Sequence, residues 1–75
     1  MKAAGFGLDL DLEGLFNLPL TDAKTRLVER FERRAIERAL ERNEGNISAA
    51  ARELGIHRQN LQQKITQLGI RTEYP

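Results

Sequence analysis

One segment of the chain, residues 21–44, contains neither proline nor glycine, although the whole chain has only 75 residues. Pro19 precedes this segment and Gly45 follows it, and both residue types are common at the borders of helices. Thr21 or Asp22 can serve as the N-cap, and an acid in the first turn suits the helix dipole. The sequence therefore predicts one long helix over residues 21–44, which Gly45 ends at the left-handed C′ position.

Apolar side chains occupy two different faces of this predicted helix. At about 100° per residue, a row of residues spaced by four drifts around the helix axis by roughly 40° per step. The early face comprises Ala23, Leu27, Val28 and Phe31. The late face comprises Ala35, Ile36, Ala39 and Leu40. We expect the late face to pack on the helices that follow and the early face to form a homodimer interface, unless residues 1–20 fold back over it.

Residues 1–20 have the character of an interdomain linker. They contain glycine at positions 5, 7 and 14, and they carry three acids against one lysine. The alternation from Leu8 to Leu12 could be a short strand, but a lone strand has no partner within so short a chain. We therefore expect residues 1–20 to be largely disordered, and residues 72–75 to form a short tail.

Composition limits the chemistry available to this chain. Without cysteine it has no disulfide and no thiol nucleophile, and its single histidine cannot build a structural metal site. Acids and arginines interleave along residues 21–44, in pairs such as Asp22–Arg26 and Glu29–Arg33, which is typical of a solvated helix surface. We expect no enzyme activity, no cofactor and no metal, and we expect a partner subunit to supplement the small core.

The sequence shows no sign of a membrane or export segment. No apolar run approaches the roughly 20 residues that span a bilayer, and Asp9 appears before any apolar region typical of a signal peptide. We therefore expect a cytoplasmic protein without a membrane partner.

The C-terminal part of the sequence predicts two short helices joined by a tight turn. Asn46 is a strong N-cap for a helix over residues 46–54, and Gly55 can end that helix in the left-handed conformation. A second helix is expected over residues 58–68. The turn glycine and the small residue Ala51 before it fit a helix-turn-helix, although an ordinary helical corner has the same spacing.

The outward face of the second short helix favours a nucleic-acid partner. It carries Arg58, Gln59, Gln62, Gln63 and Thr66. No acid occurs between Ile56 and Arg71, whereas a face that serves only solubility usually carries Glu and Lys. Arginine suits bidentate contacts with guanine and glutamine suits adenine, both in the major groove. Asn46 and Ser48 add polar groups at a helix N-terminus, where phosphate can dock, and Lys64 adds positive charge.

These segments closely resemble the Fis-type helix-turn-helix domain of NtrC-family sigma-54-dependent transcriptional activators, the bacterial enhancer-binding proteins. The resemblance covers about residues 20–70, and the run from Gly45 to Arg58 is its most specific part. The other residues that carry it are Phe31, Glu32, Arg33, Ile36, Ala39, Leu40, Leu61, Lys64, Leu68, Gly69 and Ile70. It implies an all-α, three-helix Fis- or homeodomain-like architecture over residues 21–71. In that family the long helix dimerises and the last helix enters the major groove.

The resemblance also implies the residues that contact DNA. They are Asn46, Ser48, His57, Arg58, Asn60, Gln62 and Gln63. Relatives often have Tyr, Arg or Lys where this chain has Gln62 and Gln63, so we expect its base preference and phosphate affinity to differ. His57 begins the recognition helix, where an N-cap or a phosphate contact is a better interpretation than a metal ligand.

The expected function is therefore sequence-specific binding of a palindromic enhancer in double-stranded DNA by a homodimer. By resemblance, an ATPase domain would precede this fragment in the full-length protein, which would be nucleoid-associated. One alternative is a stand-alone Fis-like architectural protein that bends DNA, against which the low net charge of +1 argues. Another is a helical dimerisation module that binds no DNA.

Overall fold

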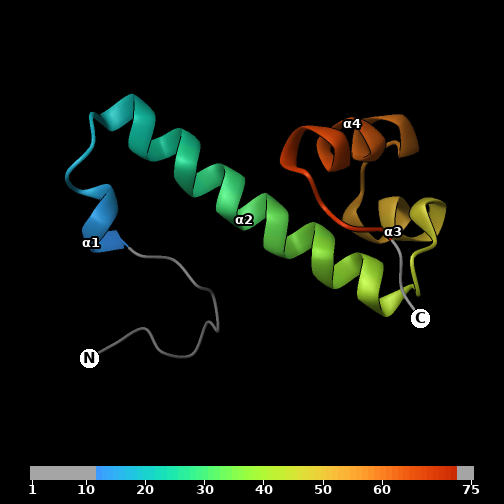
Figure 1. Ribbon diagram of the computed structural model, residues 1–75. Coiled ribbons are helices and arrows are strands. Elements are labelled where there is room, and N and C mark those ends of the chain that lie inside the picture. The colour runs from blue at the N-terminus through green and yellow to red at the C-terminus, as the bar shows by residue number, and fades with distance from the viewer. Residues whose placement is uncertain (1–11, 73–75) are drawn as a thin grey trace. The chain divides into compact units, whose positions relative to one another are not determined.

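The computed structural model describes residues 12–72, which form helices and no strand. The helices are α1 (Leu12–Leu15), α2 (Leu20–Arg42), α3 (Ile47–Leu54) and α4 (Arg58–Leu68), shown in Figure 1. The all-α fold inferred from the sequence is confirmed. The chain divides into two compact units, and the boundary lies within α2, between Phe31 and Glu32. None of the described helices is long and apolar enough to cross a membrane.

The first unit contains α1 and the first part of α2. Residues 1–11 of the expected linker lie outside the described residues, as do the last three residues of the expected tail. Helix α1 was not predicted from the sequence, and it lies in the remainder of the expected linker. Leu12 and Leu15 are three residues apart and so lie on one side of this single turn, and Leu15 is only 5% exposed.

Helix α2 begins one residue earlier than the sequence predicted. The backbone N–H of Ala23 donates to the carbonyl of Pro19 at 2.9 Å, so the hydrogen-bonding pattern of the helix already starts at Pro19. Thr21 and Asp22 consequently lie within the first turn, and neither is the N-cap. Asp22 still places a negative charge near the positive end of the helix dipole.

The C-terminal end of α2 also differs from the prediction. The N–H of Gly45 donates to the carbonyl of Leu40 at 2.8 Å, and the N–H of Glu44 donates to that of Glu41 at 3.2 Å. This pair of bonds is a Schellman motif in which Glu44 holds the C′ position and Gly45 follows it. Glu44 has a φ of 54° and is the one non-glycine residue with positive φ in the described part of the chain.

Helices α3 and α4 end with the same motif, and in both cases glycine takes the left-handed position. Gly55 has a φ of 74° and Gly69 a φ of 66°, as the sequence predicted for both. The next residue closes the motif in each case, because Ile56 donates its N–H to Ala51 and Ile70 donates its N–H to Ile65, both at 3.0 Å. All three of these helix ends are therefore determined by local hydrogen bonds.

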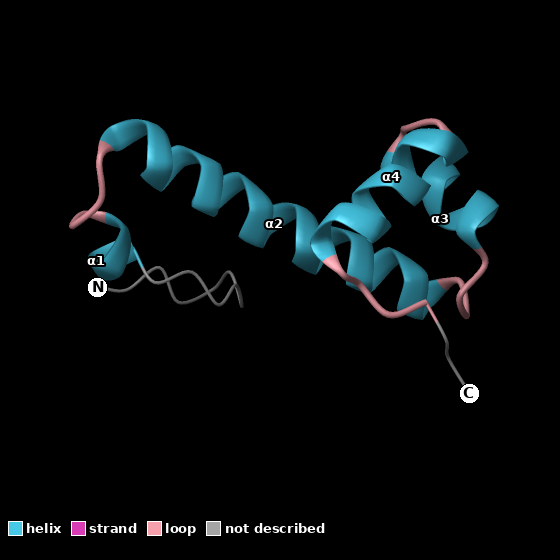
Figure 2. Ribbon diagram, turned by 45° about the horizontal axis from the view of Figure 1, so that its top comes forward, coloured by secondary structure: helices cyan, strands magenta, loops and turns pink. Residues whose placement is uncertain are grey.

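The second unit is a three-helix arrangement around one apolar core. In both views the C-terminal part of α2 lies beside α3 and α4 (Figures 1 and 2). The core consists of Ile36, Ala39, Leu40, Ala50, Ala51, Leu61 and Ile70. Ala39, Leu40, Ala50 and Leu61 have no exposed surface. The late apolar face of the long helix thus packs on the following helices, as the sequence predicted, and it holds α4 with its polar side outward.

The left-handed Glu44 predicts a stabilising substitution. Glycine adopts positive φ without the steric cost that other residues meet, so Glu44→Gly should raise the free energy of unfolding by about 0.5–1 kcal/mol. Thermal unfolding followed by circular dichroism should show a melting temperature higher by roughly 3–6 °C. Glu41→Gly is the matched control, because Glu41 lies within α2 and the same change should there destabilise the chain. An unchanged melting temperature for Glu44→Gly would contradict this interpretation of the helix end.

Candidate nucleic-acid interface

The outward side of α4 carries an open, shallow hollow lined by residues with polar side chains. Its lining residues are Gln59, Gln62, Gln63, Thr66 and Gln67, and all of them are exposed. The opposite side of α4 carries Leu61, which is fully buried, and Ile65, which packs against the core. The core therefore fixes which side of α4 faces outward, and that side carries amide and hydroxyl groups without a carboxylate.

The N-terminal end of α4 presents three further exposed polar residues, namely His57, Arg58 and Asn60. His57 is the N-cap residue by its extended backbone, but its side chain makes no capping hydrogen bond. The first turn of α4 contains no acid, so its positive dipole end is not neutralised there. Among the described residues there is no group of three His, Cys, Asp or Glu side chains that could hold a metal ion.

Asn46 and Ser48 lie at the beginning of α3, and both are exposed. Asn46 is the N-cap of α3, as predicted, because its Oδ1 accepts a hydrogen bond from the N–H of Ala49 at 3.0 Å. That bond engages the one side-chain oxygen of Asn46. The structure thus gives Asn46 a capping role, beside which a contact with DNA stays a prediction.

Lys64 lies apart from the other residues that the sequence analysis assigned to DNA. Its Nζ is 3.0 Å from Oε2 of Glu32, and both side chains are about one-third exposed. Lys64 follows Leu61 by three residues and so lies next to the buried side of α4. The structure therefore directs Lys64 toward α2, whereas Gln63 lies on the outward side.

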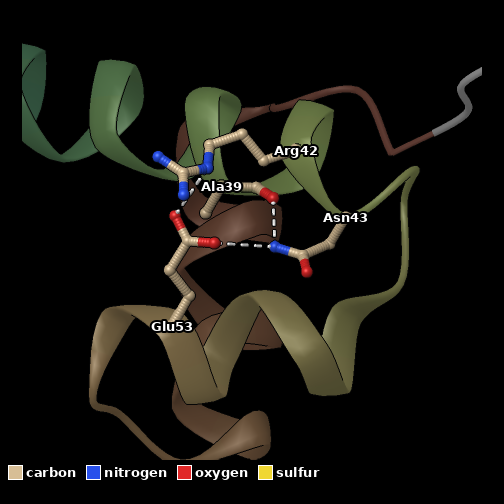
Figure 3. Close-up of polar contacts among 4 residues, drawn as sticks. All are labelled: Ala39, Arg42, Asn43 and Glu53. Atoms are coloured by element: carbon tan, nitrogen blue, oxygen red, sulfur yellow. Dashed lines mark hydrogen bonds and ion pairs between the residues drawn. The ribbon is translucent and has the colours of Figure 1, made fainter.

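Glu53 supports the position of α3, a role that the sequence pattern did not indicate. Its Oε1 accepts a hydrogen bond from Nδ2 of Asn43 at 3.0 Å, and its Oε2 lies 3.5 Å from Nε of Arg42 (Figure 3). Asn43 Nδ2 also donates to the carbonyl of Ala39 at 2.7 Å. This network joins α3 to the end of α2. Glu53 is the one acid in the sequence from Asn46 to Arg71, and that isolation is a signal that could have identified it.

The ion pairs along α2 differ from those expected. Where the sequence suggested Asp22–Arg26 and Glu29–Arg33, the structure pairs Arg34 with Glu37, with 3.5 Å between Nη1 and Oε1. Arg33 instead donates a hydrogen bond from Nη2 to the carbonyl of Leu68, the last residue of α4. The expected pair with Glu29 does not form because Arg33 bonds to the carbonyl of Leu68. Spacing along α2 predicts contacts within that helix, and this acceptor lies on α4.

A comparison with protein families decides the class of this helix-turn-helix. A family model described as "Bacterial regulatory protein, Fis family" matches residues 27–68. The chain belongs to the Fis family. Comparisons with curated proteins and with solved structures give no match.

The Fis-family match covers α2 from Leu27 onward and all of α3 and α4. A Fis-type helix-turn-helix is the DNA-binding unit of a regulator, which agrees with the acid-free outward face of α4. Of the four residues predicted for a dimer interface, the match includes Leu27, Val28 and Phe31, and it begins after Ala23.

The early apolar face of α2 is incompletely covered. Ala23 and Leu27 are half-buried, whereas Val28 is 52% exposed and Phe31 is 54% exposed. Leu20, which the sequence analysis placed in the linker, is 77% exposed and precedes Leu27 by two helical turns. The described residues therefore leave an apolar stripe on the first part of this Fis-family helix.

The network around Glu53 predicts a measurable loss of stability. Glu53→Ala removes one hydrogen bond and one partly exposed ion pair, and it should lower the free energy of unfolding by about 0.5–1.5 kcal/mol. Glu41→Ala is a suitable control, because both variants replace a helical glutamate by alanine and so gain the same helix propensity. Glu41 is exposed, and none of the described residues forms an ion pair with it. Urea unfolding of the two variants measures the difference, and equal stabilities would show that the network contributes nothing.

Proposed function

We propose that this chain is the enhancer-recognition domain of a sigma-54-dependent transcriptional regulator, which binds a palindromic site in double-stranded DNA as a homodimer. The observation that carries the proposal is the outward face of α4, where polar residues without an acid surround a shallow hollow in a Fis-family helix-turn-helix. The sigma-54 context is supported by the resemblance of the run from Gly45 to Arg58. A location at the nucleoid follows from DNA binding.

In this proposal α4 enters the major groove and reads bases with its amide-rich face. Gln62 and Gln63 suit bidentate contacts with adenine, Arg58 suits guanine, and the methyl group of Thr66 suits thymine. His57, Gln59 and Asn60 are exposed at the N-terminal end of α4, and in this proposal Asn46 and Ser48 at the start of α3 approach the backbone phosphates. The preference of this chain should therefore fall on A·T-rich half-sites that contain one guanine.

Dimer formation is supported by the apolar stripe on α2. Exposed Val28 and Phe31 lie beside half-buried Leu27, and a second copy that packs on this stripe would remove their surface from water. A net charge of +1 gives one chain little attraction for phosphate, so two chains that share one site bind more effectively than one. The two recognition helices would then meet half-sites about one helical turn apart.

The contribution of Arg58 can be tested with DNA selected from a random pool. Arg58→Ala should weaken binding to the selected site by about 1–3 kcal/mol and relax the preference at one base position. Arg71→Ala is the matched control, because it removes one exposed charge outside α4 and should weaken binding evenly across sequences. Fluorescence anisotropy on selected and random duplexes at several salt concentrations measures both effects.

The same titrations separate the alternatives. A ratio of selected to random affinity near one for the unmodified chain would replace the enhancer-recognition proposal with an architectural role. Binding that does not respond to salt, or a complete lack of binding, would contradict the DNA proposal itself.

The dimer can be tested with a charge placed in the apolar stripe. Leu27→Asp should weaken self-association at least about tenfold, because an unpaired carboxylate is costly to bury. Thr25→Asp provides the control, because both variants place an aspartate within α2. Thr25 is exposed and lies on the side of the helix opposite Leu27. Sedimentation equilibrium measures the association constants, and equal constants for the two variants would exclude this interface.

A further inference from the structure

Two neighbouring residues of α2 contact α4 through charged groups. Glu32 holds the ammonium group of Lys64 at 3.0 Å, and Arg33 donates to the carbonyl of Leu68. Lys64 and Leu68 are four residues apart and so lie one turn from each other on the same side of α4. All four residues belong to the second compact unit. The C-terminal half of α4 is therefore attached to α2 at two points.

These two contacts oppose rotation of α4 about its own axis. At about 100° per residue, Lys64 lies roughly 60° from the buried Leu61, whereas Gln63 lies roughly 160° from it. The buried Leu61 and the packed Ile65 fix which side of α4 faces outward, but apolar contacts are non-directional and leave small rotations about the helix axis open. A charged pair at the flank has one fixed partner, so a rotation that moved Gln63 away from the outward position would separate Lys64 from Glu32.

We infer that Lys64 is a positioning residue for DNA recognition, which acts through Glu32, and that it is not a phosphate contact. This inference rests on the proposed DNA-binding function. Glu32 and Arg33 set the rotation of α4, and that rotation sets which amide groups reach the bases. The bond from Arg33 adds to this, because a cation at the C-terminal end of α4 also favours the helix dipole.

The two roles of Lys64 predict opposite effects of Glu32→Gln. If Lys64 is a positioning residue, Glu32→Gln removes its partner and weakens binding to the selected DNA site by about two- to fivefold, the range of a partly exposed ion pair. If Lys64 contacts phosphate, the same change frees its charge and binding becomes tighter. Glu29→Gln removes an equal charge from the exposed surface of α2, and it corrects for the general effect of losing an acid.

Lys64→Gln and the reversed pair complete the test. For a positioning residue, Lys64→Gln should match Glu32→Gln in affinity and leave the salt dependence nearly unchanged. The double variant Glu32→Lys with Lys64→Glu should then bind within about twofold of the unmodified chain, because the pair is restored with its charges exchanged. If Lys64 contacted phosphate, Lys64→Gln would instead lower the salt slope by about one, and glutamate in its place would repel DNA.

Fluorescence anisotropy with the selected duplex measures these affinities, and circular dichroism at the same temperature ensures that each variant is folded. Weaker binding by both single variants together with rescue by the double variant supports the inference. Tighter binding by Glu32→Gln, or failure of the folded double variant to recover, overturns it. If the unmodified chain binds no DNA, the proposed function itself fails, which is a different result from a chain that binds but shows no rescue.

Discussion

The apolar core that α2 shares with α3 and α4 is the constraint on which the rest of the second unit depends. Three alanines, Ala39, Ala50 and Ala51, belong to this core, and together with Leu40 and Leu61 they are almost completely removed from solvent. Small side chains such as Ala50 and Ala51 allow α3 to approach α4 closely, and a chain this short buries only a small core. A shift in this core would therefore move the outward face of α4 directly, because nothing else of comparable size holds it.

Polar contacts at the edge of the core determine how the helices are oriented relative to one another. Glu53 joins α3 to the end of α2, and the side chains of Glu32 and Arg33 join α4 to the middle of α2. Each of these groups is partly exposed, so each contributes modestly to stability. Their effect is to select one orientation among those that the apolar groups would tolerate. The single acid of the helix-turn-helix segment is also turned toward α2, and the surface assigned to DNA remains free of negative charge.

The sequence predicted those parts of the fold that local chemistry determines. Asn46 caps α3, and Gly55 and Gly69 end their helices in the left-handed conformation, because each effect involves residues close along the chain. The end of α2 was shifted by one residue, because glycine propensity favoured Gly45 at a position that the hydrogen bonds give to Glu44.

The contacts of the candidate site could be predicted from the sequence only in part. The amide-rich face of α4 follows from helical periodicity, but the direction of Lys64 depends on an acid 32 residues away. Helical periodicity places the charged Lys64 on α4. It cannot show that Glu32, on a different helix, lies close to it. The same limit applies to Arg33, whose acceptor is a backbone carbonyl. Contacts between charged groups distant in sequence are therefore the part of the site that only the structure supplies.

The recurrent Schellman endings of α2, α3 and α4 have a consequence for how the chain folds. Each ending is made of bonds between residues at most five positions apart, so the direction of each turn can form before the helices meet. Little loop entropy then remains to be lost when the core assembles, and such low contact order is associated with folding in microseconds to milliseconds.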